Sequence, residues 1–143
     1  MAHANVTKHI DASPDTVWKV LSNPQRFEEW LTLHTKWSAE PPAEIAQGTK
    51  IKEVVTIMGM ANTIDWTVEE YDAPRSMKIT GTGMAGAEVS FTLTVEADGD
   101  GSVAGIDAEF ISQMMVGAIA GAIERASVTE LNTSLDQLAA LVV

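Results

Sequence analysis

Apolar and polar side chains alternate with a period of two through the middle of the chain. The clearest run lies at 89–95, and similar runs occur at 64–69 and 106–110. Such alternation is typical of strands with one face against a core and the other in water. We therefore expect six antiparallel strands between Thr35 and Phe110, joined by short turns. Turn-forming residues interrupt the runs at Gly48, 59–62, 73–74, 81–86 and 98–101.

Helical signals lie on both sides of this region. After a short predicted strand at 4–10, Ser13-Pro14 and Asn23-Pro24 each combine an N-cap residue with a proline suited to the first helical position. They predict helices at about 14–22 and 24–31. Residues 113–142 contain no proline, and apolar side chains recur there every three or four residues, which predicts one long helix. The stripe consists of Val128, Leu131, Leu135, Leu138 and Val142.

Composition narrows the class of protein. A chain of 143 residues, 45% of them hydrophobic, suits one α+β domain over residues 1–143. Nine basic and 20 acidic residues give a net charge of −11, which disfavours binding to nucleic acid or anionic lipid. The absence of cysteine excludes disulfides and thiolate metal sites. The N-terminus lacks a signal-peptide pattern, and no apolar run approaches the roughly 20 residues of a membrane span, so we expect a cytoplasmic protein without stable membrane insertion.

A family resemblance rests on the stretch Ile10-Asp-Ala-Ser-Pro-Asp-Thr-Val-Trp-Lys-Val-Leu-Ser-Asn-Pro, followed by Phe27 and Trp30. Trp66-Thr-Val and Tyr71-Asp-Ala-Pro add to it. With the predicted element order, these residues resemble the START-like, or SRPBCC, superfamily of Bet v 1-like and polyketide cyclase/dehydrase proteins. The resemblance covers essentially the whole chain. It implies the helix-grip fold, in which a curved seven-stranded antiparallel sheet surrounds the C-terminal helix and leaves an apolar cavity for lipids, sterols or polyketides.

A narrower resemblance concerns the runs Trp30-Leu-Thr-Leu-His34, Gly48-Thr49 and Gly59-Met60. They are similar to small actinobacterial members, some of which are described as toxins of type II toxin–antitoxin pairs. The resemblance therefore also implies an antitoxin-like protein as a partner. A homodimer is compatible with the sequence, although no feature demands one.

The expected ligand site is the apolar face of the strands together with the facing side of the last helix. Flexible methionines near strand ends suit a cavity wall that adapts to its ligand, although single methionines also fill ordinary cores. Two polar residues, His34 and Tyr71, are expected at the cavity mouth. The expected lining residues are Trp37, Met58, Trp66, Val68, Met84, Phe91, Leu93, Ile106, Phe110, Met114, Leu131 and Leu135.

Motifs for other chemistry are weak. Gly81-Thr-Gly-Met-Ala-Gly86 matches the dinucleotide fingerprint, but a strand follows where that fingerprint needs a helix. None of the three histidines has metal-ligand spacing to another histidine or carboxylate, so no metal or cofactor is expected. Asp65 and Asp107 fall on the polar faces of their strands and are expected in solvent. His34 is more readily explained by surface exposure or ordinary packing than by a functional role.

Three functions remain open. The favoured one is carriage or sequestration of a small hydrophobic ligand (lipid-, sterol- or polyketide-like), without catalysis. An enzyme of the polyketide cyclase/dehydratase type would need an ionisable side chain inside the cavity. A toxin or other interaction protein would use its surface and would be encoded beside a small antitoxin-like reading frame.

Overall fold

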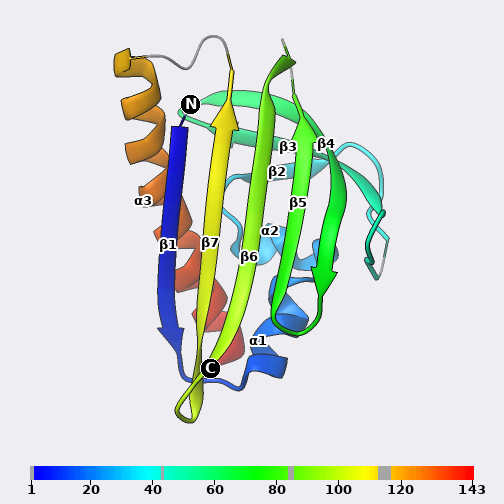
Figure 1. Cartoon of the computed structure of the whole chain (residues 1–143), viewed down its shortest axis with the longest axis vertical. Coiled ribbons are helices and arrows are strands. Elements are labelled where there is room, and N and C mark those ends of the chain that lie inside the picture. Colours follow the sequence, from blue (N-terminus) through cyan, green and yellow to red (C-terminus); the bar gives the residue numbers. More distant parts are fainter. Residues whose placement is uncertain (1, 43, 84–85, 113–116) are drawn as a thin grey trace.

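The computed structural model describes residues 2–42, 44–83, 86–112 and 117–143. Seven antiparallel strands form one sheet in the order β1-β7-β6-β5-β4-β3-β2, and the helices lie on one side of it (Figure 1). The α+β helix-grip expectation is therefore confirmed. The strands are β1 (Ala2–Ile10), β2 (His34–Trp37), β3 (Lys50–Ile57), β4 (Met60–Asp72), β5 (Ser76–Thr82), β6 (Glu88–Asp98) and β7 (Gly101–Ile111). The helices are α1 (Pro14–Leu21), the 3-10 turn η1 (Pro24–Arg26), α2 (Phe27–Trp30) and α3 (Gly117–Val142).

The two proline signals start helices of different length. Ser13 caps α1, its hydroxyl accepting from the N–H of Thr16 at 3.3 Å, and Pro14 occupies the first turn. The side chain of Asn23 caps only the three-residue turn η1 in the same way, and α2 adds one further turn. The predicted helix at 24–31 is thus broken in two.

The sheet curls around α3. In Figure 1, β1, β7, β6 and β5 stand in front, while β3 and β2 pass behind them, so one face of the sheet is concave. The helix α3 packs most extensively against β1, which is the strand at one edge of the sheet. Apolar side chains of the alternating runs point to this inner face and are buried, whereas their polar neighbours point outward.

The buried face of α3 differs from the predicted stripe. Val128 is 37% exposed, whereas Ser127 and Ser134 are completely buried together with Leu131 and Leu135. Leu131, Leu135 and Leu138 of the predicted stripe are buried as expected, and the prediction is wrong at Val128, because the polar Ser127 takes the inward position there. The helix therefore brings hydroxyl groups, as well as leucines, into the interior.

Two local irregularities change the faces of side chains. The turn between β3 and β4 consists of Met58 and Gly59, both with positive φ (53° and 76°), as in the tight two-residue turns of hairpins. In β4 the register with β5 shifts between Val68 and Glu70, a bulge that adds one residue. The bulge turns Tyr71 toward the inner face.

A glycine makes room for an interior indole. Gly81 of β5 pairs with Trp66 of β4. A Cβ at Gly81 would lie only 2.5 Å from Cγ2 of Ile64 and 2.9 Å from Cε3 of Trp66. Gly81 of the 81–86 motif is thus required for packing against Trp66. As expected, the strand β6 follows the motif where a dinucleotide site would need a helix. In the described part of the chain, no helix combines the length and apolarity needed to cross a membrane.

Candidate functional site

The inner face contains most of the residues expected to line a ligand cavity. Each of the following side chains belongs to the core and is at most 5% exposed. They are Trp66, Val68, Phe91, Leu93, Ile106, Phe110, Leu131 and Leu135. Their inward orientation agrees with the prediction from alternation. Their role in binding a ligand stays a prediction.

The interior is closed beside these residues. A void large enough for a water molecule would give its lining side chains accessible surface, and these have almost none. Beside these eight side chains the structure therefore holds a packed core in place of an open cavity. A ligand entering between the sheet and α3 has to displace side chains.

The interior contains an acid and a base in contact. His34 Nδ1 lies 2.5 Å from Glu53 Oε2, and the two side chains are only 2% and 1% exposed. The other carboxylate oxygen of Glu53 accepts a hydrogen bond of 2.8 Å from Trp66 Nε1. Both oxygens of the carboxyl group thus have a partner.

Strand register brings the three together. His34 pairs with Val55 across β2 and β3, and Glu53 follows two positions away on the same face of β3. Trp66 stands on β4 opposite Ile51, again two positions from Glu53. Diagonal neighbours of this kind lie within reach of long side chains. The curl of β2–β4 over the helices then closes the cluster from solvent.

Aromatic rings extend from this polar cluster in two directions. Trp37 lies against His34, with ring centroids 4.9 Å apart, and donates from Nε1 to the carbonyl of Pro24 at 3.2 Å. On the other side, the ring of Trp66 lies 5.2 Å from Phe91, which meets Phe110 edge-on at 6.2 Å. The acid–base pair therefore stands at one end of an aromatic row on the inner face.

The sequence analysis missed Glu53. On β3 the inward positions are Ile51, Glu53, Val55 and Ile57, and three of the four are apolar. A carboxylate at an apolar position of an alternating strand was the available signal. His34 was assigned to the cavity mouth, but its side chain is buried and its partner identifies it as part of the interior.

Two other polar residues in the interior each have an atom without a partner among the described residues. The described residues offer no hydrogen-bond partner to Nε1 of Trp30 on α2 or to Oγ of Ser127 on α3, and both residues are completely buried. By contrast, Ser134 accepts from the N–H of Thr32 and donates to the carbonyl of Glu130, both at 2.9 Å. An unsatisfied buried donor costs about 1–3 kcal/mol, so such groups in a native core require an explanation.

The other residues that were expected in the ligand site differ in their positions. Met58 is 55% exposed at the hairpin tip and does not line the interior, because the tight turn holds it outward. Tyr71 is half-buried, with its ring 5.9 Å from that of Trp18, because of the bulge in β4. Met84 and Met114 lie outside the described residues.

A depression of about 830 Å³ lies on the outer face of the sheet. Hydroxyl and charged side chains line most of it. Members include Lys50, Lys52, Asp65, Thr67, Thr80, Thr82, Glu88, Ser90 and Glu109. Sites for small apolar molecules are mostly apolar, so this surface does not suit a hydrophobic ligand.

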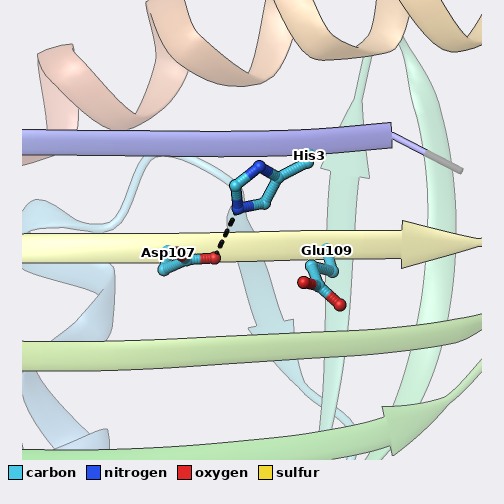
Figure 2. Close-up of side chains that lie close together, drawn as sticks. All are labelled: His3, Asp107 and Glu109. Carbon is cyan, nitrogen blue, oxygen red and sulfur yellow. Dashed lines mark hydrogen bonds and ion pairs between the residues drawn. The ribbon is translucent and has the colours of Figure 1, made fainter.

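His3, Asp107 and Glu109 gather on the same outer face (Figure 2). Their ligand-type atoms all lie within 4.8 Å of one another, although the spacing in the sequence gave no hint of this. The pairing of β1 with β7 brings them together, and His3 Nε2 lies 2.8 Å from Asp107 Oδ1. The cluster is open to water, and the histidine already has a hydrogen-bond partner in Asp107.

His9 forms a second exposed cluster at the other end of β1. Its Nδ1 lies 2.9 Å from Asp98 and its Nε2 3.0 Å from Asp11. These hydrogen bonds, with that to Asp98 the stronger influence, raise the pKa of His9 above its ordinary value of 6.5. The cluster fastens the end of β1 to the β6–β7 hairpin.

Comparison with known proteins assigns the fold and a family. The sequence profile of the family described as polyketide cyclase / dehydrase and lipid transport matches residues 1–143. The Mycobacterium tuberculosis protein Rv1546, which is uncharacterized, is 32% identical over 141 residues, 99% of each chain. Another protein of that organism, named Toxin Rv0910, is 29% identical over 135 residues, 94% of each chain.

Solved structures show the same fold at low sequence identity. TTHA0849 from Thermus thermophilus matches with a TM-score of 0.80 and 13% identity over 98% of this chain and 96% of its own. The protein Ara h 8.0201 matches with a TM-score of 0.70 and 14% identity over the same shares. These similarities cover nearly the whole chain, and their sequence identity is too low to carry site residues across.

Proposed function

Because the chain belongs to the polyketide cyclase / dehydrase and lipid transport family, we propose that it binds a small hydrophobic molecule between the sheet and α3, for carriage or sequestration. The unpaired donors in the interior are the observation that supports this most. Trp30 Nε1 and Ser127 Oγ are completely buried and have no hydrogen-bond partner among the residues that the structure describes. A ligand with acceptor oxygens would accept hydrogen bonds from these two groups. Its apolar part would replace the contacts of the core side chains that it displaces.

The first turns of α3 offer the ligand a route. Residues 117–119 are exposed, Ile119 to 54%, and Ile123 is the first residue of α3 that is buried in the core. Segments with few buried contacts open at low free energy. Opening there would uncover the α3 side of the interior without unfolding the sheet.

A titration with Nile red, an uncharged apolar dye with a carbonyl group, tests the proposal. We expect saturable binding near one dye per chain and a rise in the unfolding temperature with dye concentration. Two buried serines on α3 provide matched variants. Ser127→Ala removes an unpaired hydroxyl and should weaken dye binding about fivefold, whereas Ser134→Ala should leave the affinity unchanged. A dye that does not saturate, or equal effects of the two variants, would contradict the proposal.

Catalysis is a second candidate, favoured by the position of His34. The enzyme hypothesis required an ionisable side chain inside the fold. Asp65 and Asp107 do not meet this requirement, because their side chains are 63% and 41% exposed. His34, oriented by Glu53 through Nδ1, does meet it. A bound ligand recovered chemically altered from the wild type, and unaltered from His34→Gln, would support this candidate over simple carriage.

A toxin function is the third candidate, and it rests on the name of the relative Rv0910. A toxin of this kind would act through its surface on a partner protein. A small antitoxin-like reading frame beside the gene, whose product binds the purified chain and relieves growth inhibition, would support it. Expression without any effect on growth would argue against it.

A further inference from the structure

We propose that the His34–Glu53 pair is the anchoring point for an uncharged oxygen of the ligand, and that it selects ketones, alcohols and phenols over carboxylates. This inference rests on the proposed function, because it assumes that a ligand enters the interior. Beyond the proposed function, it identifies the residue that binds the polar end of the ligand and the chemical class of ligand that this residue accepts.

The chemistry of the donors and acceptors determines the direction of the hydrogen bonds within the cluster. An indole N–H only donates, so Oε1 of Glu53 must accept from Trp66 Nε1. One proton lies between Oε2 of Glu53 and Nδ1 of His34. The position of a further hydrogen, on Nε2 of His34, depends on the net charge of the pair.

The burial of the pair favours a net charge of zero. The two side chains are 2% and 1% exposed, and no other ion pair in the described part of the chain includes either residue. A net negative charge at this place would have no compensating cation, and uncompensated charges in an interior are strongly disfavoured. A neutral pair, whether ionic or fully protonated in form, carries a hydrogen on Nε2. Nε2 is therefore a donor from which a ligand oxygen can accept.

The surroundings of Nε2 determine which polar group of a ligand fits beside it. Nε2 lies on the side of the imidazole ring away from Glu53, and the surrounding rings of Trp37 and Trp66 are apolar. A ketone, alcohol or phenol oxygen accepts from Nε2 and adds no charge. A carboxylate also accepts, but it would stand beside the carboxyl group of Glu53 and leave the site with an excess negative charge. The aromatic row Trp66–Phe91 suits a flat ring system attached to that oxygen.

Competition against Nile red with three naphthalenes tests the selection. The compounds are naphthalene, 2-acetylnaphthalene and 2-naphthoate at pH 7, which share one ring system and differ in the group that would face Nε2. In the wild type we expect 2-acetylnaphthalene to bind about tenfold more tightly than 2-naphthoate and more tightly than naphthalene. Equal or better binding of 2-naphthoate would overturn the inference.

Glu53→Gln separates anchoring from general hydrophobicity. The amide keeps an oxygen for Trp66 and a hydrogen-bonding group for His34, but it cannot carry a negative charge. The variant should therefore bind 2-naphthoate more tightly, and the ratio between ketone and carboxylate should fall by about tenfold. Asp65→Asn changes the net charge equally on the outer face, one residue from Trp66, and should leave the ratio unchanged. A shift in all three affinities by the same factor in Glu53→Gln would contradict the inference.

His34→Asn provides the test if Glu53→Gln does not fold. Asparagine keeps a donor near the position of Nδ1 and lacks Nε2, so the advantage of 2-acetylnaphthalene over naphthalene should disappear. Retention of that advantage would refute the role of Nε2. Failure of Nile red to bind the wild type would refute the proposed function and the anchoring together, whereas binding without this ranking refutes the anchoring alone.

Discussion

His34 Nδ1 lies 2.5 Å from Oε2 of Glu53 inside an apolar core, where neither side chain is more than 2% exposed. Burying two ionisable groups costs several kcal/mol for each ion, and the mutual attraction compensates this only when the remaining hydrogen bonds are made. Glu53 meets this condition through Trp66, which donates to its second oxygen. The two residues therefore form a tightly coupled pair in which Nε2 of His34 is the remaining site for a ligand.

Removing one member of the pair should destabilise the fold more than removing both. Glu53→Ala leaves His34 and the indole N–H of Trp66 without partners and should lower the free energy of unfolding by about 3–5 kcal/mol. The double variant Glu53→Leu/His34→Phe removes both polar groups, and its free energy of unfolding should lie within about 2 kcal/mol of the wild type. Urea unfolding measures both changes.

An exposed carboxylate serves as the control for this pair. Asp65 meets Lys52 at 3.4 Å on the outer face, and Asp65→Ala should change stability by less than about 1 kcal/mol. Additive effects of the Glu53 and His34 substitutions would show that the two residues are not coupled.

The two buried serines of α3 should respond oppositely to removal of their hydroxyl groups. Ser134→Ala leaves the N–H of Thr32 unpaired and should cost about 1–3 kcal/mol. Ser127→Ala removes a group without a partner and should stabilise the apo protein by about 0.5–1 kcal/mol, since alanine is also the better helix former. Thermal unfolding without ligand measures the stability change in each variant. A similar loss of stability in both variants would contradict the assignment of Ser127 as unpaired.

Gly81 should not tolerate a methyl group. In Gly81→Ala the new Cβ would meet Ile64 and the indole of Trp66 at less than 3 Å, so Trp66 must move. We expect a loss of about 1–3 kcal/mol and a change in the near-ultraviolet circular dichroism of the tryptophans. Gly121→Ala on α3 is the matched control, because its nearest neighbour is the mobile end of Arg125 at 3.4 Å. It should be neutral or stabilise by up to about 1 kcal/mol.

Stability near neutral pH should depend on His9. Hydrogen bonds to Asp98 and Asp11 raise the pKa of His9 in the folded protein above 6.5. Its stabilising contribution is therefore complete below the unfolded-state value and is lost as the pH rises through the folded-state value. His9→Gln should lower the unfolding temperature at pH 5.5 and have little effect at pH 9. The same substitution in an Asp98→Asn/Asp11→Asn background should show no such pH dependence.

The sequence predicted the sheet well because alternation reports the faces of a strand directly. Phe91 and Trp66 were placed correctly on the inner face by this pattern alone. The rule fails where a strand has an extra residue, and the bulge after Val68 turns Tyr71 to the inner face, whereas strict alternation from Val68 would turn it outward. It also depends on polarity marking the outer face, and Glu53 and Ser127 are polar residues that face inward.

Contacts between distant strands could not be predicted from spacing. His34 and Glu53 are 19 positions apart, and His3 and Asp107 are 104 apart. Each pair depends on the register of two strands and on the curl of the sheet. Nor could the sequence show that the interior is closed beside the expected lining, because composition does not determine how completely large and small side chains fill a space.

The most direct test of the account is the response of the tryptophan indole N–H signals to a ligand. In ¹⁵N-labelled protein, the signals of Trp30 and Trp66 can be assigned from Trp30→Phe and Trp66→Phe. During a titration with 2-acetylnaphthalene, both signals should shift saturably at one ligand per chain, in parallel with the displacement of Nile red. If the ligand saturates while both signals stay in place, it binds outside the interior, and the central claim is wrong.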